Sequence, residues 1–112
     1  MKLLFNNKKE DLLSRLKKQD SAAQKIFYDQ SVKKFLSVAK SYISDTYQAE
    51  DCVIKAFCKI FKHIESFRGD GNFEGWARKI VVNECLNFIK SHKTVFYLDD
   101  VHTSVLEEIY DE

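Results

Sequence analysis

The sequence predicts an all-α domain, a small bundle of three to four helices, and three observations point to it. The 112 residues contain no proline and only three glycines, which argues against a turn-rich β-sandwich or barrel. Apolar residues make up 45% of the chain, with nine Phe, five Tyr and one Trp among them, enough for a core. Apolar positions recur at helical spacing along most of the sequence.

Two helices are predicted in the first part of the chain. Residues 8–18 carry Leu12, Leu13 and Leu16 at helical spacing and end in a polar stretch. The next helix opens at Asp20 and Ser21, and Ser21 has capping-box spacing to Gln24. The face that this second helix is expected to bury consists of Val32, Phe35, Leu36, Ala39, Tyr42 and Ile43.

A third helix follows the break at residues 44–46 and is expected to run to about Phe67. Glu50 and Asp51 are expected in its first turn, where the helix dipole favours negative charge. Its apolar positions alternate steps of three and four without a miss, which predicts one continuous buried face. That face consists of Ala49, Cys52, Val53, Ala56, Phe57, Ile60, Phe61 and Ile64.

A fourth helix is predicted after the glycine-bearing loop at residues 68–72, with Asn72 as its cap and its end near Lys93. Residues 95–112 are expected to be a linker, with a helical turn at about residues 105–110. The buried face of the fourth helix is predicted to contain Phe73, Trp76, Ala77, Ile80, Val81, Cys85, Phe88 and Ile89.

The overall charge of +1 conceals an asymmetry. Residues 95–112 hold six carboxylates and no Lys or Arg, so the preceding 94 residues carry a net charge of +7. A basic body with an acidic tail suggests a polyanionic partner. On charge alone, an ordinary solvated surface followed by a frayed end is an equally good interpretation.

One exposed face of the fourth helix has the side chains of a nucleic-acid surface. Lys79, Asn83, Asn87 and Lys90 are spaced four, four and three apart and share that face, flanked by Arg78. Asparagine offers a donor and an acceptor to a base edge, and Lys and Arg neutralise phosphates. Taken alone, the stripe is also explained by a solvated helix face that carries amides.

The loop before this helix adds to the case, because Arg68, Asn72, Phe73 and Trp76 gather around its glycines. Such a loop can accept an unstacked base by stacking and hydrogen bonding. The alternative is that Phe73 and Trp76 are core aromatics that need no ligand, although a half-exposed position suits an amphipathic Trp.

Other kinds of site are not indicated. Cys52, Cys58 and Cys85 lack the close pairing of a zinc site, His63, His92 and His102 are dispersed, and there is no phosphate-binding loop or nucleophile motif. We therefore expect no enzyme activity, no metal and no cofactor. No apolar run has the length of a membrane span or of a signal peptide, and the unpaired cysteines suit a reducing compartment, so we expect a cytoplasmic protein without membrane insertion.

Several motif blocks in order resemble region 2 of a bacterial RNA polymerase sigma factor, and the extracytoplasmic-function (ECF) group in particular. The resemblance spans roughly residues 20–93. It is carried by Ala49-Glu50-Asp51-Cys52-Val53 with Phe57, then Phe67-Arg68-Gly69-Asp70, Phe73, Trp76, Arg78-Lys79-Ile80 and Asn83.

The resemblance implies a helical domain that docks on a coiled coil of the largest subunit of core RNA polymerase. It places polymerase binding at Asp51, Ile54 and Lys55, of which only Asp51 matches the residues usual in the family, since Ile54 and Lys55 replace a Gln and a Glu. It also implies recognition and melting of the promoter −10 element, with capture of an unstacked non-template base by the loop. The resemblance and the exposed stripe together indicate a set of DNA-binding residues: Arg68, Asn72, Phe73, Trp76, Arg78, Lys79, Asn83, Asn87 and Lys90.

The resemblance also sets the expected domain organisation. Residues 1–94 are expected to form the region 2 domain and residues 95–112 an acidic linker toward an absent C-terminal helix-turn-helix domain. Because the sequence stops in that linker, we expect an excised domain rather than a natural truncation. Two other hypotheses stay open, namely a sigma-like interaction module that sequesters an anti-sigma factor or another regulator, and a general single-strand binder.

Overall fold

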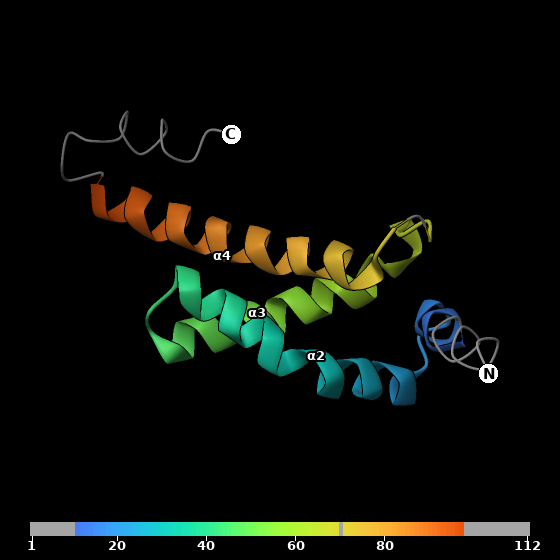
Figure 1. The fold of residues 1–112 in the computed structure, drawn as a ribbon. Helices are drawn as coiled ribbons and strands as arrows, with labels where there is room; N and C mark the ends of the chain where they lie inside the picture. The colour runs from blue at the N-terminus through green and yellow to red at the C-terminus, as the bar shows by residue number, and fades with distance from the viewer. Residues whose placement is uncertain (1–10, 70, 98–112) are drawn as a thin grey trace.

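The structure is a computed structural model that describes residues 11–69 and 71–97. Residues 11–17 are helical and precede α2 (Ser21–Tyr42), α3 (Thr46–Lys62), the short 3-10 helix η1 (Ile64–Ser66) and α4 (Phe73–Tyr97). There is no strand in these ranges, so the predicted all-α bundle is confirmed. Each of α2, α3 and α4 packs against the other two, and Figure 1 shows α4 lying along both partners.

Asp20 caps α2, with its Oδ1 accepting a hydrogen bond from the backbone N–H of Ala22 at 3.0 Å. The predicted capping box of Ser21 and Gln24 is therefore wrong, because Ser21 is already helical and the Gln24 amide donates to Gln19 Oε1. The other carboxylate oxygen of Asp20 accepts from Arg15 Nε at 2.7 Å, which ties the preceding helical segment to α2.

The buried face of α2 is only partly the predicted one. Phe35, Ala39 and Ile43 are buried as expected, but Tyr42 is 43% exposed in the last turn of the helix, although it shares the face of Phe35 seven residues earlier. The rest of the buried row lies earlier in the helix, at Ala23, Phe27 and Ser31, which continue the four-residue spacing back from Phe35. Val32 and Leu36 pack beside this row and are half-buried.

Helix α3 has the buried face that its sequence predicts, with Phe61 half-buried and the other seven positions buried. Asp45 caps it, accepting from the backbone N–H of Gln48 at 3.0 Å. The helix begins at Thr46, so Glu50 and Asp51 lie beyond its first turn, contrary to expectation. It also ends at Lys62 rather than near Phe67, since the chain tightens into η1 there.

Helix α4 is capped by Asn72 as predicted, with Oδ1 accepting from the backbone N–H of Glu74 at 2.9 Å and of Gly75 at 3.4 Å. It continues to Tyr97, past the expected end near Lys93. Ala77, Val81 and Cys85 are fully buried, and the other predicted core residues of this helix are half-buried. The helical turn expected at residues 105–110 lies outside the described residues.

Phe27 joins the three long helices at the centre of the core. Its ring centroid lies 5.9 Å from that of Phe57 on α3, 5.1 Å from that of Phe73 on α4 and 6.3 Å from that of Phe35 within α2. Tilted and edge-to-face aromatic pairs at these distances add to the stabilisation from burial. This aromatic cluster fixes the position of Phe73, and with it the start of α4.

Candidate nucleic-acid interface

The predicted stripe on α4 is present as a solvent-facing row. Lys79, Asn83, Asn87 and Lys90 are all exposed, while Ala77, Val81 and Cys85 on the opposite side are buried. The row has two amides between two cations, side chains that suit nucleic-acid recognition, and all four are open to solvent.

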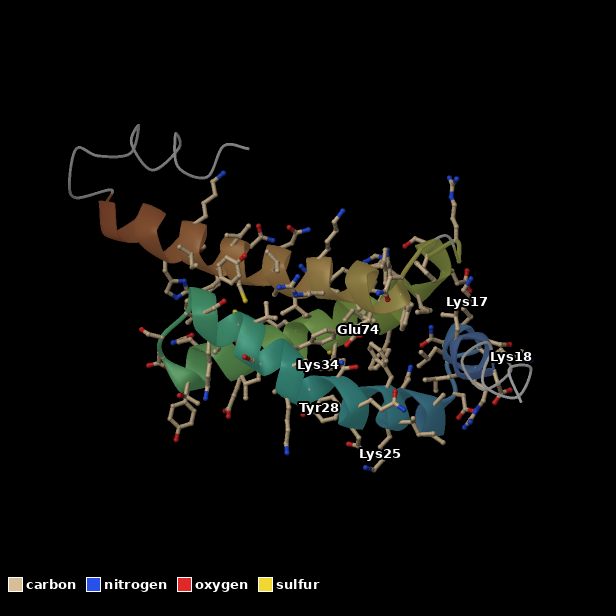
Figure 2. The ribbon with its side chains drawn as sticks, viewed as in Figure 1. Lys17, Lys18, Lys25, Tyr28, Lys34 and Glu74 are labelled. Atoms are coloured by element: carbon tan, nitrogen blue, oxygen red, sulfur yellow. The ribbon has the colours of Figure 1, made fainter. Side chains whose placement is uncertain are left out.

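Arg78 is exposed too, but it lies on a different flank of α4. Neighbouring residues on an α-helix are about 100° apart, so Arg78 shares a side with Glu74, four residues earlier. Glu74 pairs with Lys34 of α2, Oε2 to Nζ 3.1 Å, and Figure 2 shows the two side chains between these helices. Arg78 therefore lies on the same side of α4 as Glu74 and away from the row that contains Asn83.

The loop between η1 and α4 depends on two glycines. Gly69 and Gly71 have φ of +88° and +82°, in the left-handed region that other residues rarely adopt. Chain neighbours aside, no atom of the described residues lies within 4 Å of where a Cβ would stand at either position, so conformation rather than crowding favours glycine there. The turn carries the chain from η1 into α4 and exposes Arg68 and Asn72 on the surface.

A pocket of about 430 Å³ lies between this loop and the first turns of α4. The predicted site residues that it brings together are Arg68, Asn72, Trp76 and Lys79, and Lys79 is also the first residue of the exposed row. The pocket therefore lies at the start of that row. Phe67, which belongs to the motif blocks of the loop, also lines the pocket, whereas sequence reasoning missed Ser66 and Gly75 because no local pattern indicates them.

Aromatic rings form one side of the pocket. The Trp76 ring centroid lies 5.6 Å from that of Phe67, and 5.7 Å from that of Phe73 with the two rings stacked. Trp76 is half-buried and Phe67 is buried. Phe73 supports Trp76 from the core side and does not line this pocket, so its predicted contact with a base would be indirect.

The cap at Asn72 decides which part of its side chain can meet a ligand. Its Oδ1 already accepts from Glu74 and Gly75 in the first turn of α4. The amide NH2 group of Asn72 is the remaining hydrogen-bonding group, and it is a donor. The pocket thus combines an aromatic wall, an amide donor and the cations of Arg68 and Lys79.

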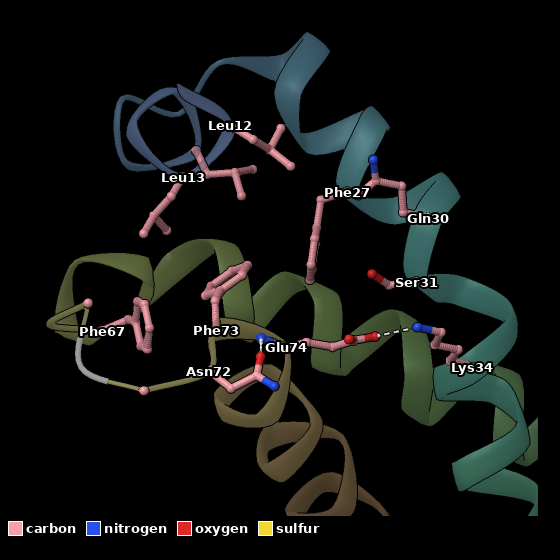
Figure 3. A pocket seen from close by; sticks show the side chains of 13 residues that line it. Leu12, Leu13, Phe27, Gln30, Ser31, Lys34, Phe67, Asn72, Phe73 and Glu74 are labelled. Atoms are coloured by element: carbon pink, nitrogen blue, oxygen red, sulfur yellow. Dashed lines mark hydrogen bonds and ion pairs between the residues drawn. The ribbon is translucent and has the colours of Figure 1, made fainter. Parts of the chain in front are cut away.

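A second and larger cavity, about 580 Å³, lies on the other side of the loop (Figure 3). The helical segment at residues 11–17, α2 and the start of α4 enclose it, with Leu12, Phe27 and Phe73 among its apolar walls. Ser31 is buried, and Figure 3 shows its hydroxyl pointing toward the cavity near the Lys34–Glu74 pair. The cavity shares Phe67 and Asn72 with the smaller pocket.

The residues predicted to bind polymerase all lie on the outer surface of α3. Asp51, Ile54 and Lys55 are exposed, and Ile54 is 54% exposed although it is apolar. Lys55 Nζ lies 3.1 Å from Asp51 Oδ2, and this hydrogen bond raises the pKa of the Lys55 ammonium. Beside them, a groove of about 450 Å³ between α3 and α4 is lined by Ile54, Lys55, Cys58, Lys59, Lys62 and Glu84.

The cysteines divide into two buried thiols, Cys52 and Cys85, and one exposed thiol, Cys58, and all three are free. Burial raises the pKa of the Cys85 thiol to about 11 and raises that of Cys52 as well. Within residues 11–69 and 71–97, no group of three His, Cys, Asp or Glu side chains could hold a metal ion. His102 lies outside these ranges.

In the same part of the chain, no helix combines the length and the apolar character that crossing a membrane requires. The two surfaces described above, the α4 row with its loop pocket and the outer face of α3, are thus carried by one compact helical unit.

Comparison with known proteins identifies the family. The sequence profile described as Sigma-70 region 2 matches residues 27–95. The chain is 31% identical to the ECF RNA polymerase sigma-E factor of Escherichia coli over 78 residues, which cover 70% of this chain and 40% of that protein. It is 25% identical to the RNA polymerase sigma-H factor of Pseudomonas aeruginosa over 87 residues, which cover 78% of this chain and 45% of that one.

The chain thus spans less than half the length of these curated relatives. No solved structure matches it significantly. The profile covers more than half of the chain, including the loop pocket, the α4 row and the outer face of α3. The chain belongs to the sigma-70 region 2 family and is the region 2 domain of an ECF-type sigma factor.

Proposed function

We propose that this domain acts in transcription initiation by docking on core RNA polymerase and by recognising and melting the promoter −10 element. The observation that supports it most is the pocket at the start of the α4 row, where Trp76, Asn72 and two cations meet. An unstacked base of the non-template strand enters this pocket. The polymerase performs all covalent chemistry, and the domain supplies specificity without a cofactor or metal.

The groups present can offset the free-energy cost of capturing a base. Extruding a base costs a few kcal/mol. Stacking on an aromatic side chain such as Trp76 returns about 1–3 kcal/mol per base. Arg68 and Lys79 add phosphate contacts, which do not depend on sequence and weaken as salt rises.

Recognition of the promoter sequence then falls to the α4 row. Asn83 and Asn87 present amides to base edges, and Lys79 and Lys90 hold the backbone on either side. Docking on the coiled coil of the largest polymerase subunit involves Asp51, Ile54 and Lys55 on α3. The domain works in the cytoplasm, with residues 1–94 as the region 2 domain and residues 95–112 as an acidic linker toward a helix-turn-helix domain.

The pocket is tested by a promoter fork that carries 2-aminopurine at the non-template position expected to unstack. With core polymerase and this domain, its fluorescence rises on binding as the base leaves the stack. Trp76→Ala is expected to abolish the rise while polymerase binding persists. Tyr28→Ala, on α2 and away from the pocket, serves as the control. An unchanged signal in Trp76→Ala would contradict capture at this pocket.

A second function has one observation in its favour, the pairing of Asp51 with Lys55 within α3. A docking carboxylate already paired in its own helix suits a module that sequesters an anti-sigma factor or other regulator instead of engaging polymerase. Replacing Lys79, Asn83, Asn87 and Lys90 by alanine distinguishes the two. If the domain opens promoters, this variant loses promoter opening. If the domain sequesters a regulator, the variant still forms the regulator complex.

A further inference from the structure

The helical segment at residues 11–17 and the turn at residues 18–20 together form what we name the N-terminal brace. The brace precedes residues 27–95, which the Sigma-70 region 2 profile matches. Leu16 anchors it in the core, where this side chain is 1% exposed. Arg15 Nε lies 2.7 Å from Oδ2 of Asp20, the residue that caps α2. The brace is thus a folded part of the domain that the family profile does not cover.

The turn of the brace holds one residue in a conformation that suits glycine. Gln19 has a φ of +61°, in the left-handed region, and no other non-glycine residue that the structure describes has a positive φ. Glycine is the usual residue at such a position after a helix, because a Cβ is strained there. A strained residue that is not glycine indicates a role for its side chain.

The side chain of Gln19 joins two distant parts of the chain. Its Nε2 donates a hydrogen bond to the backbone carbonyl of Phe61 at 2.9 Å, across 42 positions of sequence. Phe61 is the next-to-last residue of α3, and the last carbonyls of an α-helix lack partners within the helix. Gln24 Nε2 donates in turn to Gln19 Oε1 at 3.0 Å. A glycine could make neither contact, and the bonded carbonyl lies just before η1, which leads into the loop.

The brace also faces the aromatic rings that support the loop pocket. Leu12 and Leu13 lie on one side of the 580 Å³ cavity, and Phe67 and Phe73 lie across from them (Figure 3). The ring centroids of these two phenylalanines are 5.6 Å and 5.7 Å from that of Trp76. The position of the brace therefore bears on the rings behind the pocket.

From these contacts we infer that Gln19 is a positioning residue for base capture. By tying the brace to the end of α3, Gln19 keeps Phe67 and Phe73 in place beside Trp76. The inference rests on the proposed function and adds to it a residue that does not line the pocket. Losing the bond to Phe61 lowers the ratio of docked to released brace about fivefold, the usual net effect of one hydrogen bond.

The first measurement needs neither polymerase nor DNA. Trp76 is the single tryptophan of the chain, so its fluorescence reports on the pocket directly. Gln19→Glu keeps an acceptor for Gln24 but cannot donate to Phe61, so acrylamide should quench Trp76 more strongly than in the wild type. Gln48→Glu makes the same chemical change at an exposed residue in the first turn of α3 and should leave the quenching unchanged.

Gln19→Gly separates positioning from stability. The change removes both side-chain bonds but also the backbone strain, and these two effects on stability have opposite signs. Its urea midpoint should therefore stay close to that of the wild type, while its Trp76 quenching rises as in Gln19→Glu. Gln19→Ala loses the bonds and keeps the strain, so its urea midpoint should fall.

The effect on base capture is measured with the 2-aminopurine promoter fork and core polymerase. Gln19→Glu and Gln19→Gly should each weaken binding to the fork by up to about fivefold, the full shift in the docking of the brace. Their affinity for core polymerase without the fork should equal that of the wild type, since Gln19 lies on the brace and not on the outer surface of α3.

Three results would overturn the inference. Wild-type quenching of Trp76 in both variants would show that the bond does not hold the pocket. Wild-type fork binding in variants with increased quenching would show that base capture does not need the brace. A urea midpoint for Gln19→Gly as low as that of Gln19→Ala would leave Gln19 a purely structural role. A wild-type chain that gives no 2-aminopurine signal would instead remove the proposed function, and with it the role of Gln19 in capture.

Discussion

Lys59 of α3 and Glu84 of α4 form an ion pair across the helix interface, with Nζ 3.0 Å from Oε1. The two ends of the pair differ in exposure, since the Glu84 side chain is 11% exposed and the Lys59 side chain 51%. The pair links the helix proposed to dock on polymerase with the helix proposed to bind DNA. Because a buried charge without a partner is costly and an exposed one is not, the two residues should not be equivalent.

Removing Lys59 should therefore destabilise the domain more than removing the charge of Glu84. Lys59→Met keeps the aliphatic stem but leaves the nearly buried carboxylate without its cation, at an expected cost of about 1–3 kcal/mol in the free energy of unfolding. Glu84→Gln keeps the shape of the side chain and leaves a lysine that water can solvate. The free energy of unfolding is therefore expected to fall by less than about 1 kcal/mol.

Urea unfolding of the two single variants and the double variant measures this asymmetry. The double variant, Lys59→Met with Glu84→Gln, should recover most of the loss seen in Lys59→Met, since no unpaired charge remains buried. Equal losses in the two single variants would mean that the carboxylate reaches water after the pair is broken.

The buried thiol of Cys85 should make stability depend on pH in the alkaline range. Its pKa is raised from an ordinary 9.0 to about 11 in the folded chain, so the folded state holds this proton more tightly than the unfolded state does. The contribution is fully present below pH 9 and is lost as the pH rises toward 11. Urea unfolding between pH 7 and pH 10.5 should show a steeper fall for the wild type than for Cys85→Ala.

The same burial predicts which thiols react. A thiol-specific reagent at pH 8 should modify Cys58 alone in the folded chain, because the reagent attacks the thiolate and needs access to it. All three cysteines should react in urea. Cys58→Ala is the control and should show no rapid modification in the folded chain. Rapid modification of Cys52 or Cys85 in the folded chain would contradict their burial.

Asn72 has two roles that one pair of substitutions can separate. Asn72→Ala removes the cap of α4 and should lower the free energy of unfolding by about 1 kcal/mol. Asn72→Asp keeps an acceptor for the N–H groups of Glu74 and Gly75 and should retain the stability. It loses the amide donor and adds a negative charge beside the pocket, so binding to a promoter fork with polymerase should fall. Fork binding equal to the wild type would exclude Asn72 from the DNA contact.

Sequence periodicity predicted α3 well and α2 less well, for an identifiable reason. The apolar steps of three and four in α3 are uninterrupted, so its buried face is read directly. In α2 the buried row passes through Ser31, a polar residue between Phe27 and Phe35, which hides the continuation toward Ala23. Tertiary packing buries Ser31, and no local pattern contains that information.

The candidate site was predictable in its residue types and less so in its assembly. The exposed α4 row follows from helical spacing alone, as does the cap at Asn72. That Phe67 lines the pocket, that Phe73 lies behind Trp76, and that Lys34 pairs with Glu74 all depend on how the loop and α2 pack around the start of α4. The DNA-binding and polymerase-binding roles themselves stay predictions.

Because Arg78 lies on a different side of α4 from the exposed row, substitutions in these residues should weaken DNA binding to different degrees. Lys79→Ala and Lys90→Ala should each weaken binding to every promoter fork and lower the salt slope by nearly one, as the loss of one phosphate contact does. Asn83→Ala should instead cost about 1–3 kcal/mol on the preferred sequence and little on others, since an amide reads a base edge. Arg78→Ala should have the smallest effect, because Arg78 lies on a different side of α4 from the exposed row. Equal losses for Asn83→Ala on all sequences would instead favour a general single-strand binder.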